Sequence, residues 1–428
     1  MIIKHPSSAK GKKIVVVVGA GFAGLKAAQE LAHLNEVQVV VVDQRNHHLF
    51  QPLLYQVATA GLNPSDIAVP IRSQFSDSAN IEVHLGKISY VDLAAKVVVA
   101  DGGIELSYDY IILACGARHS YFAHPEWEVF APGLKTIEQA TEIRRRILLA
   151  FENAENEFVE SEKKALLTFV IVGGGPTGVE MAGAISDISQ TVLSHDFKRI
   201  DTKSAQVVLV EAGARILGSF DGSLSAQAAL DLKKMGVDVR VGTRVVNIDD
   251  QGVQLSGGGY IPAKTVVWAA GVQATPLEFK SPIIRDNSGR IKVNSDFSIP
   301  QHPEAFVVGD MASFQLTEKQ ILPGLAPAAI QAGRHAALMI KATLHGQPRV
   351  DFKYNDKGQM ATIGKTKAIA QVGNIRLTGF IAWLSWLFIH ILYLVGFKNK
   401  FAVFLQWIWS YLFAKRGSRL ITDKEWRL

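Results

Sequence analysis

The chain has 428 residues, which is enough for two or three domains with buried cores. Its composition, 48% apolar and 20% charged, excludes a disordered chain. The net charge of +6 is concentrated at one end, since residues 398–428 carry seven Lys and Arg against two Asp and Glu, a net of +5. Residues 1–13 are polar and basic without an apolar stretch, so we expect no secretory signal.

A glycine-rich loop follows the first predicted strand. The strand spans residues 14–18, and the loop, residues 19–24, has the pattern G-x-G-x-x-G with glycines at Gly19, Gly21 and Gly24. Glycines at these positions allow a tight turn and let the backbone approach a pyrophosphate. The helix that follows offers unpaired N–H groups to the phosphates. The loop therefore predicts a dinucleotide site.

An acidic residue and a lone cysteine mark the rest of the first half. The next predicted strand, residues 37–42, ends in Asp43, close to the roughly 20-residue offset expected for a carboxylate that binds a ribose. A β-rich stretch then closes with a strand that runs to Gly116. The single cysteine of the chain, Cys115, excludes a redox pair and argues against disulfide reductases and sulfide-oxidising flavoproteins. We interpret it as a small buried residue at a strand end.

The second half of the chain repeats the pattern after a charged helical run, residues 135–165. A predicted strand leads into residues 173–178, which again have the pattern G-x-G-x-x-G. The next predicted strand ends in Glu211, at a longer offset because residues 187–205 form an insertion. A carboxylate accepts hydrogen bonds from ribose hydroxyls and repels a 2′-phosphate, so NADH is favoured over NADPH here, although Arg215 lies nearby.

Two such loops, each followed by an acidic residue at a strand end, predict a protein that holds two dinucleotides at once. The alternative is a pair of buried strands with polar ends. The expected fold class is α/β, with two Rossmann-like dinucleotide-binding domains and a C-terminal helical tail. The expected divisions are residues 1–134 (first nucleotide-binding domain), 135–165 (helical linker), 166–290 (second nucleotide-binding domain), 291–345 (return to the first domain) and 346–428 (C-terminal region).

The C-terminal region combines apolar stretches, tryptophan and basic charge. Residues 379–397 carry no formal charge, and a helix of that length covers about 28 Å, just under the ~30 Å core of a bilayer. The next apolar stretch, residues 401–413, is too short to span it. Five of the seven tryptophans lie in residues 383–428. Length leaves open a spanning helix, a hairpin in one leaflet and a buried dimerisation pair. We favour monotopic attachment through residues 379–428 and expect no nucleic-acid partner.

A longer block carries a family resemblance. Residues 48–61, HLFQPLLYQVATAG, closely resemble the type II NADH dehydrogenases, which are single-subunit, non-proton-pumping NADH:quinone oxidoreductases. Residues 173–180 (GGGPTGVE), 268–272 (WAAGV) and 307–311 (VVGDM) are similar to other motifs of that family. The resemblance covers residues 12–422 and implies a glutathione-reductase-like fold, FAD in the first site and NADH in the second. It also implies a membrane quinone as acceptor, a homodimer, and a place on the cytoplasmic face of the inner membrane.

The resemblance assigns site residues. For FAD these are Gly19, Gly21, Gly24, Asp43, Gln51, Gly116, Gly309 and Asp310, and for NADH they are Gly173, Gly175, Thr177, Gly178, Glu180 and Glu211. Asp310 would meet the ribityl chain or phosphate of the flavin, although a Gly-Asp pair equally suits a plain strand and turn. Glu180 resembles a family glutamate near the nicotinamide–flavin contact, with an orienting and proton-handling role; the alternative is an ordinary carboxylate at a helix N-terminus. The twelve histidines are scattered, so we expect no metal site.

One motif departs from the family pattern. The quinone-site signature A-Q-x-A-x-Q is matched by residues 326–331, APAAIQ, in which Pro327 stands where the family has its first glutamine. Proline has neither a side-chain amide nor a backbone N–H, so it cannot make the missing hydrogen bonds. Ile330 and Gln331 remain as the predicted quinone contacts. The alternative is a helix N-terminus that packs its alanine face on the flavin and points its positive end toward it.

The expected reaction is hydride transfer from NADH to FAD, followed by transfer of two electrons to a membrane quinone. A soluble NADH-dependent reductase of a ferredoxin or rubredoxin is an alternative, against which the tail argues. A third possibility is a redox sensor that binds NADH and FAD but has lost turnover through Pro327.

Overall fold

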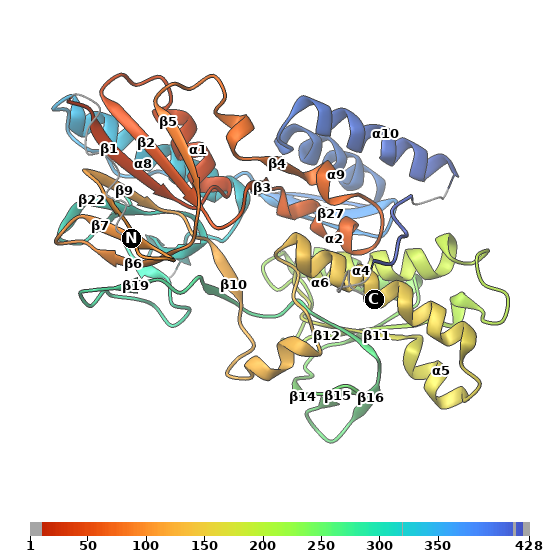
Figure 1. The fold of residues 1–428 in the computed structure, drawn as a ribbon. Helices are drawn as coiled ribbons and strands as arrows, with labels where there is room; N and C mark the ends of the chain where they lie inside the picture. The colour runs from red at the N-terminus through yellow and green to blue at the C-terminus, as the bar shows by residue number, and fades with distance from the viewer. Residues whose placement is uncertain (1–10, 319, 414–416, 423–428) are drawn as a thin grey trace. The chain divides into compact units, whose positions relative to one another are not determined.

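The computed structural model describes residues 11–318, 320–413 and 417–422, which fall into two compact units (Figure 1). Unit 1 contains the chain up to Leu49, together with Val69–Arg118 and Val272–Lys357. Unit 2 contains Phe50–Ala68, His119–Gly271 and the chain from Gly358 on. Each unit is therefore assembled from three separate stretches of sequence.

Unit 1 is built on a six-stranded sheet in the order β21-β22-β9-β1-β2-β5. Its strands are β1 (Lys13–Val18), β2 (Val37–Asp43), β5 (Ile81–Leu85), β9 (Tyr110–Leu113), β21 (Ser298–Ile299) and β22 (His302–Val307). All neighbours from β22 to β5 are parallel, and β21 runs antiparallel at the edge. The strand β1 in the middle of this sheet consists of β-branched residues from position 14 to 18. Its residues 15–17 are fully buried, as expected for a parallel strand that is covered on both faces.

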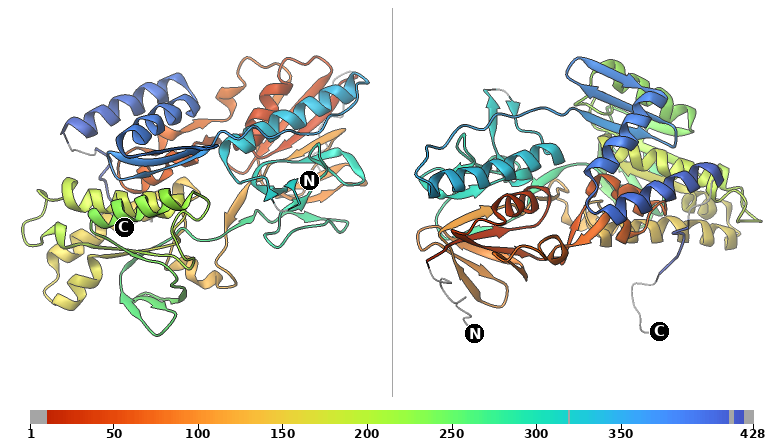
Figure 2. Two further views of the ribbon diagram at one scale, coloured as in Figure 1. Left: turned by 180° about the vertical axis from the view of Figure 1, so that it is seen from behind. Right: turned by 90° about the horizontal axis from the view of Figure 1, so that it is seen from above.

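Two helices of unit 1, α1 (Phe22–Leu31) and α8 (Ala326–Leu344), lie side by side (Figures 1 and 2). They approach closely because Gly333 faces Ala23, where a Cβ would lie 2.0 Å from the Ala23 carbonyl oxygen. A second sheet shares the same core through Ile88, Val91 and Val98. Its strands are, in order, β19 (Glu278–Phe279), β6 (Ile88–Asp92), β7 (Val97–Ala100) and β8 (Ile104–Ser107).

The smaller elements of unit 1 complete it. They are β3 (His47–Leu49), η2 (Arg72–Gln74), β6 (Ile88–Asp92), β7 (Val97–Ala100), β8 (Ile104–Ser107), β18 (Val272–Ala274), β19 (Glu278–Phe279), β20 (Ile291–Lys292), η6 (Gly309–Met311), β23 (Ala312–Ser313), β24 (Gln315–Thr317) and β25 (Gln320–Ile321). The strands β4 (Ala68–Pro70) and β10 (Ala117–His119) contain points where the chain passes between the units.

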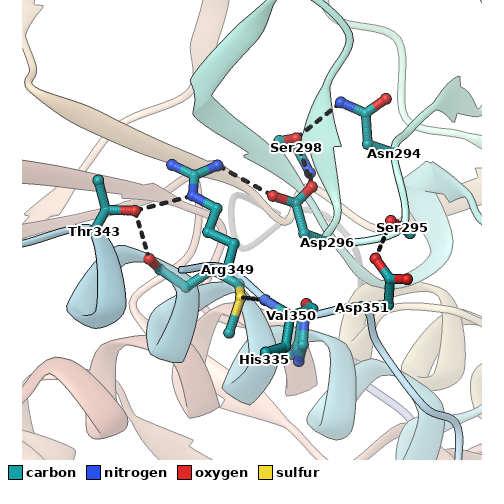
Figure 3. A network of polar contacts seen from close by, with 10 residues as sticks. Asn294, Ser295, Asp296, Ser298, His335, Thr343, Arg349, Val350 and Asp351 are labelled. Atoms are coloured by element: carbon teal, nitrogen blue, oxygen red, sulfur yellow. Dashed lines mark hydrogen bonds and ion pairs between the residues drawn. The ribbon is translucent and has the colours of Figure 1, made fainter. Parts of the chain in front are cut away.

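Residues 349–355, which follow α8 in the sequence, form a strap within unit 1. Figure 3 shows its first three residues, Arg349, Val350 and Asp351, with their polar contacts. Arg349 anchors the strap, with Nη1 donating to Asp296 Oδ2 at 3.1 Å and Nε donating to Thr343 Oγ1 at 2.9 Å. Burial alone would raise the pKa of Asp296, but the hydrogen bonds from Ser298 and Arg349 outweigh this effect and lower the pKa. Further contacts are Val350 N to Met339 Sδ (3.2 Å), His335 Nε2 to Val350 O (3.0 Å) and Ser295 Oγ to Asp351 Oδ1 (2.5 Å).

Unit 2 is built on a four-stranded parallel sheet in the order β13-β12-β11-β17. Its strands are β11 (Thr168–Val172), β12 (Gln206–Val210), β13 (Val237–Arg240) and β17 (Thr265–Trp268). The remaining elements before the tail are η1 (Gln51–Leu53), α2 (Leu54–Ala58), α3 (Pro64–Ile67), η3 (Pro125–Val129), α4 (Ile137–Asn156), α5 (Glu160–Leu166), α6 (Pro176–Asp187), α7 (Gly222–Lys234), β14 (Val245–Ile248), β15 (Gly252–Leu255) and β16 (Tyr260–Pro262). The predicted insertion at 187–205 contains the short turns η4 (Ile188–Val192) and η5 (Thr202–Ser204).

The C-terminal part of unit 2 is a three-stranded antiparallel sheet with two helices. The sheet contains β26 (Gln359–Ile363), β27 (Lys367–Val372) and β28 (Ile375–Thr378), and α9 (Gly379–Tyr393) packs on it. A break at residues 394–396 separates α9 from α10 (Phe397–Phe413). Because of this break, none of the helices in the described residues has the length and apolar character needed to cross a membrane. Residues 414–416 and 423–428 of the predicted membrane-contacting region, Trp426 among them, lie outside the described residues.

Candidate active site

The first glycine loop has the geometry of a phosphate cradle. Gly19 has a φ of +95°, and a Cβ there would lie 2.4 Å from the Ala114 carbonyl oxygen. A Cβ on Gly24 would lie 1.8 Å from the Gly19 carbonyl oxygen, so both positions need glycine for backbone packing. Gly21 differs, because a Cβ there would meet nothing within 4 Å. That open space lies at the N-cap of α1, where backbone N–H groups without an intrahelical partner can bind a pyrophosphate. The residues present therefore fit the dinucleotide.

Asp43 fastens this loop. Its Oδ2 accepts a hydrogen bond from Ala20 N at 2.6 Å, and its Oδ1 accepts one from Arg45 N at 2.8 Å. His48, 2% exposed, donates from Nδ1 to Ala20 O at 2.9 Å, and burial lowers its pKa. Sequence reasoning placed His48 in the family-like block without a role; the structure gives it one in the position of the loop.

The other residues assigned to FAD divide between the units. Gly116 and Gly309 both have positive φ, +68° and +71°, and Gly309 begins the turn η6 that carries Asp310. A Cβ on Gly324, just before α8, would lie 3.3 Å from Asp310 Oδ1, so the carboxylate lies against this loop. Gln51 belongs instead to unit 2, where its Nε2 donates a long hydrogen bond of 3.4 Å to Lys135 O.

The second glycine loop repeats the first. Gly173 has a φ of +109°, and a Cβ there would lie 2.6 Å from Ala270 N, while a Cβ on Gly178 would lie 1.8 Å from the Gly173 carbonyl oxygen. A Cβ on Gly175, at the N-cap of α6, would again meet nothing within 4 Å. Thr177 follows in the first turn of α6 and is half-buried.

Glu211 plays the part of Asp43 in unit 2. Its Oε2 accepts from Gly174 N and its Oε1 from Gly213 N, each at 2.6 Å. The nearby Arg215 donates from Nη2 to the carbonyl oxygens of Gly218 (3.0 Å) and Phe220 (3.1 Å). The guanidinium of Arg215, which the sequence suggested as a possible partner for a 2′-phosphate, is thus held by backbone carbonyls.

Two other kinds of chemistry, thiol redox exchange and metal binding, can be assessed from the described residues. Burial raises the pKa of the Cys115 thiol to about 12, so the thiolate that redox exchange requires does not form at neutral pH. No group of three or more His, Cys, Asp or Glu within the described part of the chain could hold a metal ion.

A small cavity of unit 2 contains Glu180. The cavity has a volume of about 70 Å³, and its walls come from α2, α6, β26, α9 and α10. Since one water needs about 10–15 Å³ of such space, it has room for several waters or part of a ring. Glu180, in the second turn of α6, accepts one long hydrogen bond, from Thr362 N at 3.4 Å. Its removal from water raises the pKa of the carboxyl to about 8, against the lowering effect of the Thr362 N–H.

Sequence reasoning missed most of this cavity. Besides Glu180 it is lined by Tyr55, Gln56, Thr59, Gly61, Ala184, Asp187, Thr362, Gly364, Lys365, Trp383, Trp386, Leu387, Trp407 and Ser410. Tyr55 and Gln56 lie within the block quoted for the family resemblance, so a signal for them was present. The tryptophans had been assigned to a membrane interface, but Trp383, Trp386 and Trp407 are 7%, 2% and 6% exposed.

The predicted quinone contacts lie on α8 in unit 1. Gln331 donates from Nε2 to Asn355 O at 2.9 Å and accepts from Asn355 N at 3.0 Å, so its amide pairs with the strap. Pro327 is in the first turn of α8, where a backbone N–H would have no intrahelical partner, and proline is therefore compatible with the helix. Ile330 is half-buried on the same helix.

Comparisons with known proteins agree with this geometry. Residues 13–333 match the pyridine nucleotide-disulphide oxidoreductase family, and residues 357–416 match the NDH2 C-terminal domain. The type II NADH:quinone oxidoreductase Ndh of Mycobacterium tuberculosis is 40% identical over 96% of this chain and 90% of its own length. The internal alternative NAD(P)H-ubiquinone oxidoreductase A1, mitochondrial, of Arabidopsis thaliana is 30% identical over 97% of this chain and 87% of its own length.

Solved structures establish the fold. The structure of NDH2 from Plasmodium falciparum in complex with NADH has a TM-score of 0.88 at 18% identity, covering 96% of this chain and all of that one. The sulfide:quinone oxidoreductase from Aquifex aeolicus has a TM-score of 0.72 at 19% identity, with 91% and 92% covered. The predicted α/β fold with two dinucleotide-binding halves and a helical C-terminal part is confirmed. From these matches, the chain belongs to the type II NADH:quinone oxidoreductase family.

Proposed function

We propose that this protein oxidises NADH and passes two electrons through bound FAD to a quinone, without pumping protons. The observation that carries this function is the pair of glycine loops, one in each unit, in a chain 40% identical to a named type II NADH:quinone oxidoreductase. The names of the relatives support a quinone acceptor and not the alternative of a ferredoxin or rubredoxin.

The loops give each nucleotide its own site. FAD, when bound, accepts the hydride of NADH and releases two electrons to the quinone. In unit 1, the space at Gly21 and the N–H groups of α1 would hold its pyrophosphate, with Asp43 keeping the loop in shape. In unit 2, Gly175 and Thr177 would hold the phosphates of NADH. Glu211 would exclude a 2′-phosphate, because its carboxylate is negative and Arg215 is occupied by backbone carbonyls.

Glu180 would handle a proton. Reduction of a quinone to a quinol takes up two protons, and a carboxyl with a pKa of about 8 is mostly protonated at pH 7. The aromatic wall of its cavity suits a flat ring, which supports this cavity as part of the quinone site. Ile330 and Gln331 stay predicted quinone contacts; the pairing of Gln331 with the strap favours a structural role for that residue.

The tail would attach the protein to a membrane surface. One set of apolar side chains on α9 and α10 is exposed: Phe380, Ile381, Leu384, Phe388, Leu392, Phe397, Phe401, Phe404, Leu405, Ile408 and Trp409. Together with the basic charge of residues 398–428, this surface suits the headgroup region of an anionic bilayer. We place it on the cytoplasmic face of the inner membrane, and we expect a homodimer.

Stopped-flow absorbance tests the function. NADH should bleach the yellow flavin, and a short-chain quinone should restore its colour within the same experiment. An unbleached flavin would leave only the sensor hypothesis. A bleached flavin that rubredoxin reoxidises and quinone does not would mean a protein acceptor. Sedimentation with anionic vesicles and light scattering in detergent test the membrane attachment and the homodimer.

A further inference from the structure

A row of four hydrogen bonds connects the C-terminal helix α10 with Glu180. Trp407 Nε1 donates to Gln56 Oε1 at 2.8 Å, and Gln56 Nε2 donates to Tyr55 Oη at 3.0 Å. Tyr55 Oη lies 3.0 Å from Thr362 Oγ1, and Thr362 N donates to Glu180 Oε1 at 3.4 Å. The five residues come from α10, α2, β26 and α6, all within unit 2.

The row has a direction set by its first member. An indole N–H can only donate, so the Gln56 amide must present its oxygen to Trp407 and its NH₂ to Tyr55. Tyr55 Oη accepts from Gln56 and lies 3.0 Å from Thr362 Oγ1, a contact in which either hydroxyl can be the donor. Thr362 joins the row through its hydroxyl and contacts Glu180 through its backbone N–H, so side-chain contacts link the residue beside Glu180 to α10.

Because the side chains of the row are buried, breaking one of its hydrogen bonds destabilises the folded protein. Tyr55, Thr362 and Trp407 are 8%, 3% and 6% exposed, and a buried polar group that loses its partner is destabilised strongly. Beyond the row, α10 is held by Asn399, whose Nδ2 donates to Ser65 O at 3.2 Å. Its opposite face is exposed, with Phe401 57% accessible. A shift of α10 is therefore transmitted into the cavity through Trp407.

We propose that α10, through Trp407, Gln56 and Tyr55, positions the Thr362 amide against Glu180 and so sets the protonation of this carboxyl. The three side chains act as positioning residues. The proposal rests on the proton-handling role of Glu180 given above. With the row complete, the Thr362 N–H stabilises the ionised carboxylate; with the row broken, that contact weakens and the proton is held more tightly. The other titratable groups lining this cavity are Asp187, Lys365 and Tyr55.

Infrared titration of the full-length, FAD-loaded protein in detergent tests the proposal. The carbonyl stretch of protonated Glu180 is identified by its absence in Glu180→Gln, and its midpoint is measured from pH 6 to 10. Tyr55→Phe removes one hydroxyl and keeps the ring, and Trp407→Phe removes the indole N–H. Each should raise the midpoint by about half to one pH unit. The matched control is Trp409→Phe, on the same helix but 57% exposed, which should leave the midpoint where it is.

The double variant Tyr55→Phe/Trp407→Phe provides a second measurement. Because both changes interrupt one row, its midpoint should shift no further than that of a single variant. A Tyr55→Phe midpoint that coincides with the wild type, or shifts that add fully in the double variant, would overturn the proposal. Failure of quinone to reoxidise the wild-type flavin would overturn the proposed function instead and would leave these midpoint shifts intact.

Discussion

Replacing Glu180 by glutamine should make the protein's stability respond differently to pH. The carboxyl has an ordinary pKa of 4.5 in the unfolded chain, and burial raises it to about 8 in the folded protein. The folded state therefore binds a proton more tightly than the unfolded state. Wild-type stability should fall as the pH rises from 4.5 through 8 and should level off above 8. The amide of the variant does not titrate, so it lacks this dependence.

The size of the effect follows from the difference between the two pKa values. Each pKa unit corresponds to about 1.4 kcal/mol. With pKa values of 4.5 and about 8, the wild type should lose roughly 2 kcal/mol relative to Glu180→Gln between pH 6 and pH 8, and only a few tenths more by pH 9. For a unit of this size, 2 kcal/mol corresponds to a change of about 4–8 °C in Tm.

Thermal unfolding of both proteins, followed by tryptophan fluorescence at pH 6, 7, 8 and 9, measures the difference. The quantity of interest is the Tm of the variant minus that of the wild type, which should widen up to pH 8 and then stay constant. A difference that does not vary with pH would refute the reasoning, because it would mean that Glu180 is ionised in the folded protein at pH 6. Glu160→Gln, at a side chain 83% exposed, controls for exchange of a carboxyl for an amide.

Four further substitutions test the nucleotide sites and the strap. Gly24→Ala should abolish flavin binding and folding of unit 1, because its Cβ would lie 1.8 Å from a backbone oxygen, whereas Gly21→Ala should keep the fold and lower only the flavin content; absorbance and circular dichroism report both. Glu211→Gln should raise the KM for NADH and improve kcat/KM for NADPH by about tenfold, since the negative charge is lost. Arg349→Met should cost about 1–3 kcal/mol at pH 7 in urea unfolding. That cost should shrink as the pH falls through the lowered folded-state pKa of Asp296, where the carboxylate that needs Arg349 becomes protonated.

The nucleotide loops were predictable because their signal is local. Gly19 and Gly24 meet backbone atoms of their own loop or of a neighbouring parallel strand, and that constraint leaves a pattern within a few residues. Asp43 and Glu211 follow from the same local logic, since each fastens the glycine loop beside the strand that it ends. The loop geometry could be predicted because it depends on a short segment with a characteristic residue pattern.

The cavity around Glu180 was not predictable in this way. Its walls come from segments more than 300 residues apart, as in the contact between Tyr55 and Thr362, and nothing local marks the pairing. The partners of Gln331 were hidden for a related reason, because the backbone of Asn355 satisfies its amide and leaves no pattern in the side chains. Every residue type except proline has both a backbone N–H and a C=O, so such a partner cannot be recognised from its side chain.

The aromatic residues of the two C-terminal helices, α9 and α10, are divided between a buried face and an exposed face. Tryptophan and phenylalanine in residues 379–413 predicted a membrane contact, but the helices divide them by face. Trp386 and Trp407, with ring centroids 5.5 Å apart, belong to the interior of unit 2, whereas Phe388 and Trp409 are 65% and 57% exposed. The helix α10 exposes apolar rings on one face and holds the hydrogen-bond partner of Gln56 on the other, so the two faces cannot move independently. If the exposed face makes the proposed membrane contact, any force that the bilayer exerts on α10 acts on the wall of the cavity that contains Glu180.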